Sequence, residues 1–143
     1  MSILKRILIL FFAIHLTGCA VNRASGELMA GATIPMDAHY YVVTEEEEKR
    51  DTDKLIAEAL LDRGLAASSG PGDSVPEETG VVVKYDDKWM WDITMYMLEL
   101  TITFEDPADE FPIATGNSYH TSLTRLSPEE MVDEVLTNIF AAE

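Results

Sequence analysis

The chemically distinctive residue of this 143-residue chain is Cys19, its only cysteine. Lys5 and Arg6 form a short cationic start, an almost unbroken apolar run covers residues 7–16, and small residues then lead to the thiol. This order is typical of a secretory signal. A helix needs about 20 apolar residues to cross a bilayer, so the shorter run favours an export signal over a transmembrane anchor.

The four residues Leu16-Thr17-Gly18-Cys19 resemble a bacterial lipobox. The resemblance implies that the Cys19 thiol is diacylglycerylated, that the bond between Gly18 and Cys19 is cleaved, and that residues 1–18 are a lipoprotein signal peptide. The alternatives are an ordinary cleaved signal and an uncleaved anchor that contains a cysteine. Two or three acyl chains hold a protein on a membrane effectively permanently.

The expected address is the periplasmic face of the outer membrane. In many Gram-negative bacteria an Asp directly after the acylated cysteine favours retention at the inner membrane, and this chain has Ala20 there. With Cys19 committed to lipid, no second cysteine remains for a disulfide. We therefore expect the core alone to stabilise the domain.

The charge of the chain is strongly acidic, with 26 Asp and Glu, 10 Lys and Arg, and a formal net charge of −16. Loss of residues 1–18 removes Lys5 and Arg6 and no acidic residue, so the mature chain is more negative still. Nucleic-acid binding requires a basic face, so we expect no nucleic-acid partner. Adsorption to anionic headgroups by charge is excluded on the same ground.

The rest of the chain predicts a tether followed by one domain. Residues 20–38 mix Gly, Pro, Ser and Asn without periodicity, so we interpret residues 19–38 as the lipidated N-terminus and a tether, and residues 39–143 as the domain. Breakers gather again at residues 66–79, which predicts a polar loop. Asp86 and Asp87 have the residue type of a turn at a strand connection.

Hydropathy patterns predict four strands and two helices in the domain. Strands are expected at residues 39–44, 80–85, 91–104 and 111–124, and a helix at residues 52–63 that ends before Gly64. A second helix begins after Ser127, which has Pro128 behind it and Glu130 at the third helical position, as in a capping box. The order β-α-β-β-β-α predicts an α+β two-layer sandwich, a mixed sheet with two helices on one face.

Catalytic and metal-binding motifs are missing from the sequence. It holds no Gly-x-Ser-x-Gly elbow, Walker loop or His-Glu-x-x-His pair, so we expect neither an enzyme nor a cofactor. His39 and His120 lie beside predicted strands and would have to meet across the sheet. A zinc site needs three or four ligands, so no metal site is predicted.

Two groups of residues are candidates for binding. Residues 116–122 are dense in hydrogen-bonding side chains, and Asn117, Tyr119 and His120 would serve a polar groove for cell-wall glycan, although a polar outer strand face has the same composition. Trp89, Trp91, Ile93, Met95 and Met97 form an apolar stripe at odd positions, out of phase with the even stripe that follows. Either a bulge near Met97 turns this stripe into the core, or the stripe is an exposed partner-binding surface.

The layout of lipobox, short tether and one α/β domain resembles the small bacterial envelope lipoproteins that assist transport and assembly machines. The resemblance implies binding without catalysis. Our leading hypothesis is a membrane-anchored periplasmic module that binds or assembles an envelope protein. The alternative is a lipoprotein that binds a small ligand, either a cell-wall glycan or a cation.

Overall fold

The structure is a computed structural model that describes residues 21–45 and 50–143. These residues form β1 (Arg23–Leu28), β2 (His39–Thr44), α2 (Thr52–Asp62), β3 (Ala66–Pro71), the 3-10 turn η1 (Gly72–Ser74), β4 (Thr79–Asp92), β5 (Thr94–Glu105), β6 (Pro112–Tyr119) and α3 (Pro128–Ala141). The predicted signal peptide, Gly18 and Cys19 lie outside the described residues.

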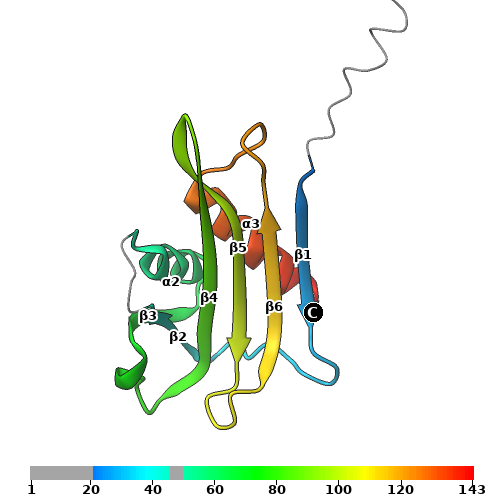
Figure 1. Ribbon diagram of the computed structural model, residues 1–143. Helices are drawn as coiled ribbons and strands as arrows, with labels where there is room; N and C mark the ends of the chain where they lie inside the picture. The colour runs from blue at the N-terminus through cyan, green and yellow to red at the C-terminus, as the bar shows by residue number, and fades with distance from the viewer. Residues whose placement is uncertain (1–20, 46–49) are drawn as a thin grey trace, which may run out of the picture.

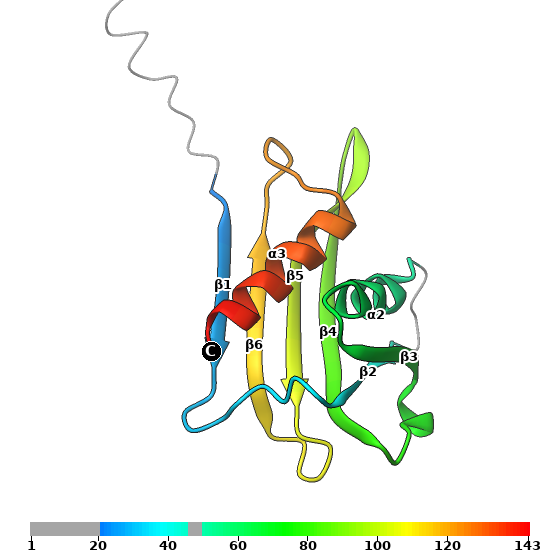
Figure 2. The ribbon, with the colours of Figure 1, turned by 180° about the vertical axis from the view of Figure 1, so that it is seen from behind.

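The described strands form a six-stranded sheet in the order β1-β6-β5-β4-β2-β3. The pairs β1–β6, β6–β5 and β5–β4 are antiparallel, whereas β2 pairs in parallel with both β4 and β3. Both helices lie on the same face of the sheet, as the two opposite views in Figures 1 and 2 show. The predicted fold class, an α+β mixed sheet with two helices on one face, is confirmed. We call the sheet face without helices the open face.

Helix α3 begins as its sequence predicts. The Ser127 side chain accepts a hydrogen bond from the Glu130 amide, and the Glu130 carboxylate accepts one from the Ser127 amide, which completes the capping box. Helix α2 ends before Gly64, whose φ of 82° is left-handed backbone that favours glycine. Both helix boundaries are therefore set by local chemistry.

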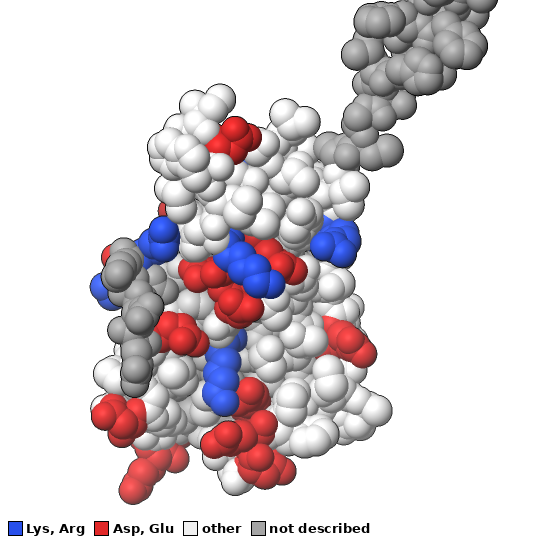
Figure 3. Space-filling view, in the orientation of Figure 1, with Lys and Arg blue, Asp and Glu red and all other residues white. Residues whose placement is uncertain are grey.

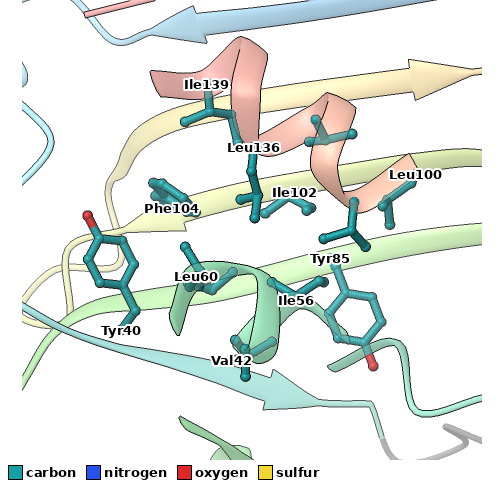
Figure 4. Close-up of a cluster of buried hydrophobic side chains, with 14 of the residues drawn as sticks. Tyr40, Val42, Ile56, Leu60, Tyr85, Leu100, Ile102, Phe104, Leu136 and Ile139 are labelled. Atoms are coloured by element: carbon teal, nitrogen blue, oxygen red, sulfur yellow. The ribbon is translucent and has the colours of Figure 1, made fainter. Parts of the chain in front are cut away.

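The core lies between the helices and the sheet (Figure 4). Each helix turns an apolar stripe to the sheet, Ile56 and Leu60 from α2 and Leu136 and Ile139 from α3, and all four side chains are fully buried. The rings of Tyr40 and Phe104 meet edge to face with centroids 5.3 Å apart. Burial, aided by the charge of Glu143, raises the pKa of Tyr40 to about 12, so this phenol stays neutral.

The prediction of a tether over residues 19–38 is wrong for much of this segment. Residues 23–28 form β1, the edge strand that pairs with β6, and Ile34 is buried in the core. Glycine usually interrupts strands, but Gly26 is required in β1 because a Cβ there would lie 2.0 Å from the backbone oxygen of Asn138 in α3. The helix packs directly on the backbone of β1.

The predicted polar loop over residues 66–79 is also partly wrong. Residues 66–71 form β3, which pairs in parallel with β2 at the other edge of the sheet. The Tyr41 hydroxyl donates to the Pro71 carbonyl oxygen at 3.0 Å and lies where a Cβ on Gly70 would be. Small residues are therefore required beside this buried tyrosine.

The predicted strands over residues 80–85 and 91–104 have different bounds. They belong to one long hairpin in which β4 continues to Asp92, the chain turns at Ile93, and β5 begins at Thr94. Asp86 and Asp87 lie inside β4, so the prediction of a turn there is wrong. Strand β6 ends at Tyr119, short of the predicted residue 124.

Gly26→Ala tests whether residues 23–28 belong to the sheet. The added methyl group would overlap the α3 backbone, so we expect the free energy of unfolding to fall by about 1–3 kcal/mol, the usual effect of overpacking. Denaturant titration would measure it. Ser25→Ala, on the exposed side of the same strand, is the control and should be nearly neutral. Equal effects of the two substitutions would contradict the packing of α3 on β1.

Candidate functional site

The structure separates the three predicted ligand-binding residues. Asn117 and Tyr119 lie on the open face, whereas His120 follows β6 and is buried on the helix side, where Ser118 is also buried. Successive side chains of a strand alternate between faces, so a single groove cannot take all three. The predicted grouping is wrong for His120.

On the open face, polar side chains of four strands bind one another. The Asn117 amide donates to Glu99 Oε1 at 3.0 Å and to Thr101 Oγ1 at 2.9 Å. Lys88 Nζ donates to Glu99 Oε2 at 2.8 Å. The hydrogen bond from Lys88, followed by that from Asn117, lowers the pKa of Glu99, and the same pairing raises the pKa of Lys88. The Arg23 guanidinium lies 4.7 Å from the centre of the Tyr119 ring.

His120 links the end of β6 to α3. Its Nδ1 lies 3.0 Å from the Thr124 carbonyl oxygen and its Nε2 lies 2.8 Å from Glu134 Oε2. Ser118 also donates to Glu134 Oε2 and not to the imidazole, so the cluster lacks the serine–histidine contact of a hydrolase. We interpret it as a structural link, and sequence reasoning missed Glu134 as its centre.

His39 and His120 do not meet. His39 lies at the start of β2 with its Nε2 3.1 Å from Ser68 Oγ, and both β4 and β5 separate β2 from β6. Within residues 21–45 and 50–143, no three His, Cys, Asp or Glu side chains are placed to hold a metal ion.

The apolar stripe runs over both strands of the β4–β5 hairpin. Trp89 pairs with Met97, Trp91 pairs with Met95, and Ile93 occupies the turn between them. The register shifts between Lys88 and Trp89, which leaves one extra residue on β5 and constitutes the predicted bulge near Met97. The bulge explains the change of phase in the sequence.

The stripe is divided between core and surface. Met97 is fully buried, and Trp89 packs against the core, with its Nε1 donating to Asp87 Oδ2 at 2.9 Å and the Arg50 guanidinium 4.5 Å from its ring centre. Trp91 is 69% exposed and Ile93 is 85% exposed. Neither prediction holds for the whole stripe, because the hairpin extends beyond the helices that cover its base.

We call Met90, Trp91, Ile93 and Met95 the hairpin tip. Ile93 has a φ of 63°, a left-handed conformation that a β-branched residue rarely adopts and that destabilises the fold by about 1–3 kcal/mol. Asn or Gly would relieve this strain, so the sequence keeps an exposed isoleucine at a position that disfavours it. This position is a candidate for a functional contact.

The loop between β6 and α3 lies against the hairpin tip. Arg125 donates from Nη1 to Thr94 Oγ1 at 2.7 Å, and its guanidinium lies 4.8 Å from the centre of the Tyr96 ring. The same loop contacts the residue that precedes β1, because the Thr124 hydroxyl donates to Asn22 Oδ1. Leu123, which directly precedes Thr124 and Arg125, is 87% exposed.

In the part of the chain that the structure describes, no helix is both long and apolar enough to span a membrane. No protein-family model matches the chain, and no curated protein matches it. Similarity to known proteins is therefore found in solved structures.

The chain is similar to the PelC dodecamer from Paraburkholderia phytofirmans, at 11% identity and a TM-score of 0.61 over 83% of this chain and 98% of that one. A second PelC dodecamer from this organism, a point variant, gives 13% identity and a TM-score of 0.59, with 83% and 97% covered. A PDZ domain protein from Parabacteroides distasonis gives 9% identity and a TM-score of 0.50, covering 96% of this chain and 40% of that one. At these identities the likeness shows a shared fold.

The division of the stripe predicts opposite results for two substitutions. Met97→Ala opens a cavity in the core and should lower the free energy of unfolding by about 2–5 kcal/mol. Trp91→Ala removes an exposed side chain and should change it by no more than about 0.5 kcal/mol. Thermal and denaturant unfolding of both variants would measure the difference. A large loss of stability with Trp91→Ala would place the hairpin tip in the core.

Proposed function

We propose that this protein is a lipid-anchored module of the bacterial cell envelope that binds or assembles an envelope protein without catalysis. The lipobox resemblance at Cys19 supports the anchor. We place this anchor in the outer membrane, on the side that faces the periplasm. The strongly acidic composition supports an anchor made by lipid and not by charge. The domain then acts at the membrane surface.

The observation that carries the binding role is the open face. It spans β1, β6, β5 and β4, and no described helix covers it (Figure 1). Figure 3 shows Lys and Arg side chains beside Asp and Glu in the middle of this face. Small-ligand sites are concave, and three depressions of the described surface lie away from the open face, at the ends of β2 and β3 and beside the two helices. An extended polar face favours a protein partner.

The structural comparison adds support for assembly. The PelC structures are described as dodecamers, so this fold occurs in a multi-subunit complex. The PDZ domain protein has a related fold in 40% of its own, longer chain. These likenesses extend to the fold, and the assembly role of this chain is our proposal.

The alternative, a glycan or cation site, has less support. A sugar would stack on the Tyr119 ring, but the Arg23 guanidinium lies over that ring. A cation would use Glu99, whose two carboxylate oxygens already accept hydrogen bonds from Lys88 and Asn117. The open face therefore uses its polar groups internally.

Cys19→Ser tests the anchor. We expect loss of fatty-acid incorporation, measured by metabolic labelling with palmitate, and release of the protein from the membrane fraction. The described domain should unfold as before, because residues 21–143 contain the whole described core. Labelling that persists in the Cys19→Ser protein would contradict acylation at this position.

Thr101→Arg tests the open face. Thr101 lies in its middle, so a long cation there should block close contact and reduce a specific chemical crosslink to the partner by about tenfold, the effect of 1.4 kcal/mol. Ala108→Arg adds the same charge in the exposed turn between β5 and β6 and is the matched control. Equal crosslinking by the two variants would place the partner on another surface.

A further inference from the structure

Exposed apolar side chains gather at one end of the molecule. The hairpin tip and Leu123 lie at the end where the β4–β5 hairpin and the loop from β6 to α3 project (Figure 1). The other exposed large apolar side chains, apart from Val21 near the chain entry, lie away from this end. A grouped apolar surface on a water-exposed domain points to a contact.

This end is also nearly free of charge. Between Met90 and Met95 the one charged residue is Asp92, and residues 121–124 carry none. Arg125 borders this end, where its guanidinium contacts Thr94 and the Tyr96 ring. On the face that Figure 3 shows, this end carries one acidic group, whereas Asp and Glu side chains are spread over the rest of that face. An acidic domain thus presents one end that is poor in charged side chains.

The chain enters the domain at this same end. Arg23 at the start of β1 stands in one row across the sheet with Tyr119, Glu99 and Lys88. Ile93 lies five residues beyond that row, roughly 17 Å along the strand. Cys19 precedes Arg23 by four residues, which span at most about 14 Å when extended. Cys19 can therefore reach the level of Trp91, which lies three residues, about 10 Å, beyond the same row.

The hairpin tip is apolar on both sides. Met90 and Trp91 are neighbours in β4 and so point to opposite sides of the hairpin, yet both are exposed. A protein partner docking on a flat surface would cover one side. A lipid surface surrounds an inserted hairpin from all directions, and tryptophan prefers the interface between lipid and water.

We propose that the hairpin tip, with Leu123 beside it, inserts into the interfacial layer of the membrane that carries the acyl chains of Cys19. This inference rests on the proposed lipid anchor. The anchor attaches the domain to the membrane, and the hairpin tip fixes the orientation of the domain. In this orientation β4 points with its hairpin end into the membrane, and the open face stays in water. The strained Ile93 is retained because its side chain is buried in lipid.

Tryptophan fluorescence of the mature lipidated protein in vesicles of brominated phosphatidylcholine tests this insertion. Trp89→Phe leaves Trp91 as the reporter, and Trp91→Phe leaves Trp89 as the matched control at the base of the hairpin. We expect Trp91 emission to shift to the blue and to be quenched by the brominated lipid, and Trp89 emission to be unaffected. If Trp89→Phe fails to fold, subtracting the Trp91→Phe spectrum from the wild-type spectrum isolates Trp91.

Unquenched Trp91 in protein that carries a palmitate label would overturn the insertion while leaving the anchor intact. A blue-shifted but unquenched Trp91 would likewise overturn it, in favour of a covering protein or second copy. Quenched Trp91 in unlabelled protein would overturn the anchor and support the insertion. Absence of both signals would overturn both.

Ile93→Asn separates insertion from stability. Asn tolerates left-handed backbone, so the melting temperature measured without lipid should rise. Quenching of Trp91 on vesicles should fall, because an amide replaces the apolar side chain at the turn. Stronger or unchanged quenching in this variant would contradict a role for Ile93 in lipid.

Discussion

The antiparallel pairing of β4 with β5 is the interaction on which the rest of the domain depends. One side of this hairpin, from Val81 to Tyr85 and from Leu100 to Phe104, forms the floor of the core beneath both helices. Strand β2 joins it through β4, and β6 and β1 join it through β5. Leu98 is the extra residue of the bulge. It lets the odd-numbered apolar residues up to Met97 and the even-numbered ones from Leu100 face the same side of the hairpin. Beyond Trp89 and Met97 the hairpin continues past the helices into solvent.

Sequence reasoning predicted the elements whose signals are local. The capping box at Ser127, the helix end at Gly64 and the mixed sheet under two helices follow from such signals, and the structure has all three. The phase change before Leu98 allowed either a bulge or an exposed stripe, and the structure has the bulge. What the phase change left open was how far the helices cover the hairpin, which is a property of tertiary packing.

The elements that were missed are strands whose composition is set by their neighbours. Gly26 weakens the strand pattern of β1, but the glycine is required by the α3 backbone that passes over it. Gly70 and Pro71 give β3 the composition of a loop. Both are required by the buried Tyr41, because its hydroxyl fills the space beside Gly70 and donates a hydrogen bond to the Pro71 carbonyl oxygen. His120 has the residue type of a ligand, but Glu134, fourteen residues away, makes it structural. These dependences are long-range and leave no local pattern.

The proposed function uses the two directions that the fold distinguishes. The projecting hairpin and the chain entry at Asn22 share one end, joined by the hydrogen bond from Thr124. The open face runs along the side of the molecule, where paired charges keep it polar and hydrated. In our account a membrane contact at the end holds the open face perpendicular to the lipid surface, in reach of an envelope partner.

Spin-label depth measurements test this orientation most directly. Cys19 is the only cysteine, so once it is acylated an introduced cysteine is the sole thiol available for labelling. On the lipidated protein in vesicles, we expect a label at Leu123→Cys to be more accessible to oxygen than to a water-soluble nickel complex. The opposite order is expected at Ala108→Cys, in the turn between β5 and β6 at the opposite end of the sheet. A label at position 123 that is as accessible to the nickel complex as one at position 108 would contradict the account.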